Sequence, residues 1–291
     1  MKLVLLILLG CLWSVHLAAM KSAGQSGLPP LVVAPVSILG IAFFYSAVAT
    51  ACRKWPPLRP EAAGFYVLSG FLGFVLPFLL EVFVAPKLPL FIFVVIISTM
   101  PIFTTILAVL AGVESVNLKG VAAVLLGFGA AIMIVWDTAE LSTDPVSWDW
   151  FLAAFAVPTL YAVNTVFVAS RWPKRVDAIS VAHGQALVVA MATLAGSIIS
   201  GSICEWHLVT GNIPAIGLIG VGEGLTLLVY LNLARDYGPS LVSLANFISL
   251  FFAAIIGAVF FDDGLTWLSA LAGVLLVTAL TLRNQESRGG T

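Results

Sequence analysis

One acidic residue stands in the middle of an apolar stretch. Glu223 lies near the centre of residues 213–234, and the rest of that stretch is uncharged. A charge at the centre of a bilayer costs on the order of 3 kcal/mol on insertion scales, and no Lys or Arg is expected at comparable depth. The carboxyl must therefore be protonated, be paired with His16, sit in water, or meet a cationic ligand. We predict that Glu223 lines a transport cavity and couples to protons or binds an amine; a neutral carboxyl bonded between helices is the alternative.

His16 is the second proton-coupling candidate, because an imidazole changes its charge near neutral pH. The alternative is a single structural hydrogen bond to a neighbouring helix. About 148 residues later the chain carries Asn164 at a matching place, and Trp13 and Tyr161 each lie one helical turn before these two polar residues. The aromatic pair is expected either to form the walls of a cavity for an organic substrate or to pack in the core.

Other polar residues and prolines fall within predicted helices. Uncharged polar side chains in an apolar bundle either line a cavity or bond neighbouring helices; this group comprises Ser98, Thr99 and Asn246. A proline inside a helix frees a backbone carbonyl and forms a hinge or a fixed kink; the candidates are Pro77 and Pro101. His183 and Glu114 lie near predicted helix ends, where water is expected to reach them, and are interpreted as interfacial or structural.

These residues belong to a strongly apolar chain. Of its 291 residues, 61% are hydrophobic and 9% are charged, with a mean hydropathy of +1.11, whereas a soluble domain carries about 25% charged residues. Its uncharged runs match the roughly 20 residues that cross a bilayer. The sequence therefore predicts an all-α integral membrane protein with ten transmembrane helices, near residues 3–20, 31–52, 62–84, 88–113, 118–136, 150–170, 178–203, 213–234, 240–261 and 265–282.

The basic residues predict an orientation. With ten helices and an inner N-terminus, eleven Lys and Arg residues fall inside and only Lys21 and Lys87 fall outside, as the positive-inside rule favours. Both termini are then cytoplasmic. The halves resemble each other at an offset of about 149 residues, which predicts five-helix repeats over 1–143 and 144–291. Because five is odd, the second repeat is inverted, an arrangement that recurs in secondary transporters.

Several other functions are disfavoured. The formal net charge of −1 provides no basic face for nucleic acid, and the three cysteines form no CxxC pair, so neither metal nor cofactor is expected. An intramembrane enzyme would need a metal motif such as HExxH, paired central aspartates, or a serine with a histidine base. That class and a non-transporting membrane scaffold remain the alternatives to a transporter.

The chain resembles the EamA family of the drug/metabolite transporter superfamily over essentially its whole length. Leu12–His16 is similar to the Trp-Gly-x-Asn motif of the family's first helix, Ser98–Phe103 to its proline-bearing fourth helix, and Val113–Glu114 to its Gly-Glu pair. Ser14, His16 and Val113 depart from these motifs. The resemblance implies export of small metabolites, such as amino acids or related amines, across a bacterial inner membrane by alternating access. We expect a monomer or homodimer whose partners are a small solute and the lipid bilayer.

Overall fold

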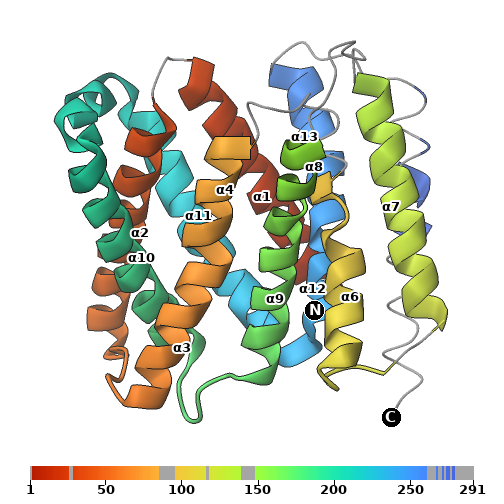
Figure 1. The fold of residues 1–291 in the computed structure, drawn as a ribbon, viewed down its shortest axis with the longest axis horizontal. Coiled ribbons are helices and arrows are strands. Elements are labelled where there is room, and N and C mark those ends of the chain that lie inside the picture. The colour runs from red at the N-terminus through yellow and green to blue at the C-terminus, as the bar shows by residue number, and fades with distance from the viewer. Residues whose placement is uncertain are drawn as a thin grey trace.

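The structure, a computed structural model, consists of helices and their connections in the residues that it describes. These are 2–25, 29–84, 96–115, 118–138, 148–260, 267, 271, 273–275 and 277–278. The helices stand side by side in one bundle (Figure 1). In the first half of the chain the elements are α1 (Lys2–Gln25), α2 (Pro30–Cys52), α3 (Pro60–Gly70), η1 (Phe71–Val75), α4 (Leu76–Val84), α6 (Met100–Leu110) and α7 (Leu118–Thr138). In the second half they are α8 (Trp148–Ala154), α9 (Ala156–Ser170), α10 (Ala178–Ser200), η3 (Ser202–Asn212), α11 (Ile213–Tyr237), α12 (Pro239–Ser243) and α13 (Ala245–Phe260).

Most predicted helices occur where expected, but several are interrupted. The helix predicted over 150–170 breaks at Phe155 between α8 and α9, and the one over 240–261 breaks at Leu244 between α12 and α13. The connection before α11 contains a 3-10 helix, η3, which was not predicted. The helix predicted over 265–282 and the first part of 88–113 lie mostly outside the described residues.

Pro77 explains the interruption of the helix predicted over 62–84. Its nitrogen carries no hydrogen and cannot donate to the carbonyl of Gly73 one turn earlier. The chain forms a π-helix, η1, just before it, in which the backbone N–H of Leu76 donates to the carbonyl of Phe71, five residues back. Such wider turns occur where the regular helical ladder is disturbed. Pro77 itself is buried in α4.

The helix predicted over 88–113 is also interrupted, just before Pro101. Pro101 lies in the first turn of α6, where a proline is compatible with a helix because the first N–H groups have no partner within the helix. Ser98 and Thr99 form a turn immediately before α6. Residues 96 and 97 before this turn are helical, so Pro101 begins the second part of an interrupted helix.

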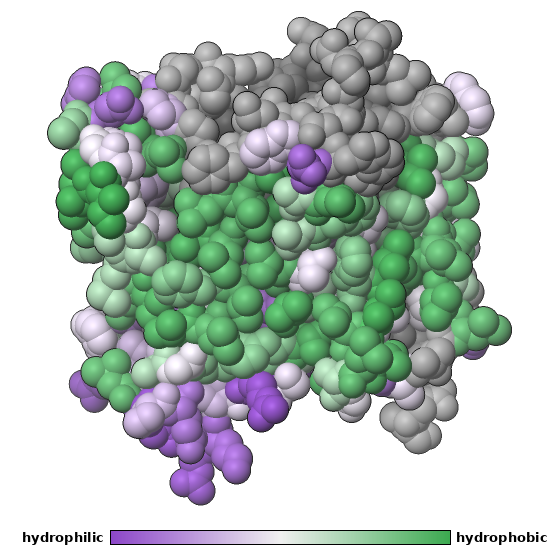
Figure 2. All heavy atoms as spheres, in the orientation of Figure 1, coloured by the Kyte–Doolittle hydropathy of each residue, from purple (hydrophilic) through white to green (hydrophobic). Residues whose placement is uncertain are grey.

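The bundle has an apolar middle. Four of the described helical segments are long and apolar enough to span a membrane, at Leu31–Cys52, Leu152–Ser170, Ala178–Ser200 and Ile216–Tyr237. Figure 2 shows apolar side chains covering the middle of one face and hydrophilic side chains gathered at its lower edge. This distribution is that of a protein with a lipid-facing surface between two polar ends.

Helices from the two halves of the chain pack against each other. In the first half α1 packs against α11 and α13, and α2 packs against α10 and α11. In the second half α9 packs against α4 and α6. The core between them includes the fully buried side chains of Leu9, Tyr45, Leu231 and Phe247. Any site at the centre of the bundle is therefore built from both halves.

Small residues allow the closest helix contacts. A methyl group added at Gly127 in α7 would overlap the ring of Phe247 in α13, which is only 1% exposed and has no free space to move into. Gly129, two residues later on the same helix, has no atom within 4 Å of the place where its Cβ would lie. The two glycines therefore differ in packing but share a helix.

Replacing Gly127 by Ala is expected to destabilise the bundle by about 1–3 kcal/mol, because overpacking forces α7 and α13 apart. Thermal unfolding in detergent measures the effect. The matched control Gly129→Ala should leave the melting temperature unchanged or slightly raised, since alanine favours a helix over glycine. Equal losses from both variants would contradict this packing.

Candidate functional site

The carboxylate of Glu223 meets the imidazole of His16. Glu223 lies in α11 and His16 in α1, and His16 Nδ1 lies 3.4 Å from Glu223 Oε2. The side chains are 20% and 25% exposed, respectively. One residue comes from each half of the chain. Pairing with His16 was one of the four alternatives for Glu223, and the structure places the two side chains next to each other.

A small cavity adjoins this pair. Glu223 and Gln185 of α10 line it together with apolar side chains from α2, η1, α10 and α11, namely Ile38, Ile41, Phe74, Ala186, Val189 and Leu227. Its volume of about 20 Å³ is enough for one water molecule. The free space beside Glu223 is therefore small in this structure.

Polar atoms without hydrogen-bond partners gather around Glu223. Within the described part of the chain they are the two atoms of the pair itself, Glu223 Oε2 and His16 Nδ1, which make an ionic contact but no hydrogen bond, and also Gln185 Oε1 and Ser37 Oγ. Ser37 is close because its carbonyl would lie 3.3 Å from a Cβ at Gly220, one turn before Glu223. Buried polar atoms are normally paired, since an unpaired one costs about 1–3 kcal/mol. Four such atoms in one region indicate a place where a ligand or water binds.

Asn164 belongs to a buried hydrogen-bond network next to this region. Gln185 Nε2 donates to Ser69 Oγ, and Ser69 Oγ donates to Asn164 Oδ1 at 2.7 Å. Asn164 Nδ2 donates to the Tyr230 hydroxyl at 3.2 Å, which donates to Thr165 Oγ1 at 3.2 Å. All five side chains are at most 7% exposed. The network joins α3, α9, α10 and α11, and reaches the cavity through Gln185.

The remaining predicted residues lie elsewhere. Asn246 Nδ2 in α13 donates to the carbonyl of Ile97 at 3.3 Å, and Thr99 Oγ1 donates to the carbonyl of Ile96. Ser98, which precedes Thr99 in the sequence, is buried. These contacts surround the start of α6. No described residue of this group lines the cavity at Glu223.

The aromatic pair does not line that cavity either. Trp13 is partly buried and packs against the main hydrophobic core. The backbone carbonyl of Tyr161 accepts the Thr165 hydroxyl at 2.7 Å, so this residue adjoins the buried network through its main chain. The residues that form the site beside Glu223 and His16 are different ones, Ser37 and Gln185.

Sequence reasoning missed Gln185 and misplaced His183. His183 is fully buried, contrary to the expectation that water reaches it; its Nε2 lies 2.9 Å from Ser46 Oγ and its ring lies 5.2 Å from that of Trp55. A polar residue within a long apolar run was the available signal for both. The same criterion selected Glu223 and Asn246 within their predicted helices, but it was not applied to Gln185, and His183 was assigned to a helix end.

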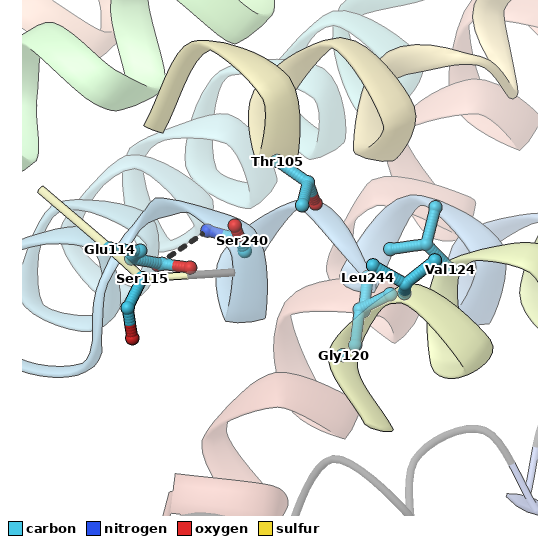
Figure 3. A pocket seen from close by; sticks show the side chains of 8 residues that line it. Thr105, Glu114, Ser115, Gly120, Val124, Ser240 and Leu244 are labelled. Carbon is cyan, nitrogen blue, oxygen red and sulfur yellow. Dashed lines mark hydrogen bonds between the residues drawn. The ribbon is translucent and has the colours of Figure 1, made fainter. Parts of the chain in front are cut away.

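Glu114 connects the two halves at a helix end. Its Oε1 accepts the backbone N–H of Ser240, at the start of α12, at 3.1 Å (Figure 3). Gly238 precedes that helix with a φ of 88°, and a Cβ there would lie 2.6 Å from the same carboxylate oxygen. A structural role was predicted for Glu114, and the capping contact is of that kind. In the residues that the structure describes, no group of three His, Cys, Asp or Glu side chains could hold a metal ion.

Comparisons with known proteins give a family for part of the chain and a fold for nearly all of it. The EamA-like transporter family matches residues 1–136. A solved crystal structure matches 99% of this chain and 97% of its own chain, with a TM-score of 0.76 and 17% sequence identity. That identity supports a shared fold alone. Among curated proteins there is no match.

Replacing Tyr230 by Phe is expected to destabilise the protein by about 1–2 kcal/mol, because Asn164 Nδ2 loses its buried acceptor. Thermal unfolding in detergent measures the change. Tyr237→Phe, two turns later on α11, is the matched control and should have a smaller effect. A Tyr230→Phe variant as stable as the wild type would show that the network does not hold these helices together.

Proposed function

Because the chain belongs, through residues 1–136, to the EamA-like transporter family, we propose that it is a secondary active transporter that moves small organic solutes across a lipid bilayer. The observation that carries this proposal is the Glu223–His16 pair, surrounded by unpartnered polar atoms within an apolar bundle. Ionisable groups at such positions usually face a ligand or an ion pathway.

The proposed architecture is ten transmembrane helices in two inverted five-helix repeats, 1–143 and 144–291. Reciprocal packing supports it. The first helix of the first half, α1, packs against α11 and α13, and its counterpart in the second half, α9, packs against α4 and α6. α2 and α10, second in each half, pack against each other. An approximate twofold axis between the repeats would produce this pattern.

Alternating access follows from where the pair lies. Since His16 and Glu223 belong to opposite halves, rocking of one half against the other would open a path to either side of the membrane and change the distance between them. The proposed location is the inner membrane of a bacterium, with both termini cytoplasmic, and the proposed activity is the export of amino acids or related amines.

Proton coupling would use the same pair. When Glu223 is protonated, it can share a neutral hydrogen bond with His16; when it is ionised, it can bind a cationic solute or a protonated His16. A solute that displaces the proton from Glu223 is then exchanged for it. Hence a pH gradient across the membrane would drive the solute in the direction opposite to the proton.

The two alternative functions, an intramembrane enzyme and a non-transporting scaffold, explain the residues of the site less well. An intramembrane enzyme would need a nucleophile or a metal at the pair, and the cavity beside it is lined by Gln185, Glu223 and apolar side chains. A non-transporting scaffold would gain nothing from a carboxylate at that depth. The family match also favours transport over either alternative.

Replacing Glu223 by Gln is expected to abolish pH-gradient-driven solute flux in proteoliposomes, because the amide cannot take up or release a proton. Flux is measured against a panel of amino acids, amines and nucleobases, with and without a pH gradient. Flux driven by a solute gradient alone should be less affected.

The control is Glu61→Gln, which changes an exposed carboxylate in the first turn of α3. It should leave flux unchanged. If Glu223→Gln retained full flux with the same pH dependence, proton coupling at this residue would be excluded. If the purified protein neither bound nor moved any solute of the panel, the transporter proposal itself would be contradicted.

The native cysteines test the proposed orientation. Cys52 ends α2 and Cys204 lies in η3, and both are exposed. The proposed topology puts Cys204 outside and Cys52 inside. A membrane-impermeant maleimide should therefore label intact cells through Cys204, and Cys204→Ser should remove most of the label whereas Cys52→Ser should not. The reverse pattern would invert the topology.

A further inference from the structure

We propose that the site at Glu223 selects an organic ammonium ion without a carboxylate, such as an amine with an apolar body. This proposal rests on the proposed transport function and narrows its substrate class. It is carried by the direction of the hydrogen bonds in the buried network, which determines whether the wall of the cavity offers donors or acceptors.

The direction is set at one end of the network by a backbone carbonyl. The carbonyl of Tyr161 can only accept, so the Thr165 hydroxyl must donate its single hydrogen to it. Thr165 Oγ1 therefore accepts from the hydroxyl of Tyr230. Because the hydrogen of Tyr230 is used in this way, its oxygen accepts from the side-chain amide of Asn164, and this bond must come from the NH₂ group.

Each further hydrogen bond of the network has its direction fixed in the same way, as far as the residue that lines the cavity. With its NH₂ group on Tyr230, Asn164 presents Oδ1 to Ser69, whose hydroxyl donates to it. Ser69 then accepts from Gln185, which must offer its NH₂ group. Gln185 is thus left with its carbonyl Oε1, which has no partner among the described residues. A flip of this amide would put two acceptors against each other at Ser69.

Among the other groups near Glu223, the Ser37 hydroxyl has no partner and can donate or accept, and the rest add no strong donor. The hydroxyl of Tyr45 donates to the carbonyl of Gly224, and that of Thr226 donates to the carbonyl of Gly222. None of the residues that line the cavity is a Lys or an Arg. His16 can donate through Nδ1, but Glu223 already lies next to that atom. The unpartnered polar groups of this region are therefore two acceptors, the Glu223 carboxylate and Gln185 Oε1, and the Ser37 hydroxyl, which can accept as well as donate.

A ligand complementary to two acceptors must bring hydrogen-bond donors and positive charge. An ammonium group supplies both, whereas a carboxylate would be desolvated beside Glu223 without a cation to balance it. The rest of the cavity wall is apolar, with Phe74, Ile41 and Leu227 among its members, which suits an apolar body. The present volume has no room for an organic molecule, so such a ligand enters when the halves open.

Three probes of one shape test the charge requirement. Phenethylamine carries only an ammonium group, phenylalanine carries ammonium and carboxylate, and 3-phenylpropionate carries only the carboxylate. Their flux into proteoliposomes, and their binding to the purified protein by calorimetry, should favour phenethylamine over each of the others by about tenfold or more.

Two variants test the role of the network. Gln185→Met removes the carbonyl acceptor at similar volume and should weaken phenethylamine binding about tenfold, as expected for a hydrogen bond to a charged group. Ser69→Ala releases the Gln185 amide to rotate, so the preference for phenethylamine over 3-phenylpropionate should shrink. Thr193→Val, on α10 and outside the cavity, is the control and should change neither value.

The outcomes separate this proposal from the transport function. Flux of phenylalanine or 3-phenylpropionate equal to that of phenethylamine would overturn the ammonium proposal and leave the transporter in place. Absence of phenethylamine binding, with another solute transported, would do the same. If no solute were bound or transported, the proposed function would fail as well. A selectivity ratio unchanged in a folded Ser69→Ala protein would overturn the part assigned to the network.

Discussion

A carboxylate that leaves water must recover its solvation from the protein around it, and in an apolar bundle few groups can provide that. Glu223 is supplied with His16 at 3.4 Å and a cavity with room for about one water molecule. Neither fully satisfies an ion. In the proposed function, a proton or a cationic solute would complete this solvation.

The buried polar groups near Glu223 also need hydrogen-bond partners within the protein, and the helices around them lie close enough to provide these. Asn164 reaches Ser69 and Tyr230 only because α9 comes very close to η1, where a side chain at Gly73 would overlap the Asn164 amide. The π-helix before Pro77 includes this glycine. Irregular backbone at this place thus serves a buried network, as is common where helical geometry departs from regular.

Helices of the two halves share both the pair and the network. His16 and Ser69 come from the first half, whereas Glu223, Gln185, Asn164 and Tyr230 come from the second. Glu114 adds a contact at a helix end, to the start of α12. Motion of one half against the other would have to break or rearrange such bonds. Opening of the site would therefore change the contacts of the polar groups that form it.

The sequence by itself determined the apolar character and the positions of most helices, because hydropathy and helix length depend on local composition, and it singled out Glu223 through the cost of a buried charge. It also suggested His16 as a partner. Only the tertiary structure decided that Asn164 bonds Ser69 and Tyr230 rather than joining the pair, that Gln185 lines the cavity, and that His183 is fully buried. These depend on how each helix is rotated and how closely its neighbours approach, and contacts between residues 66 or more positions apart set both.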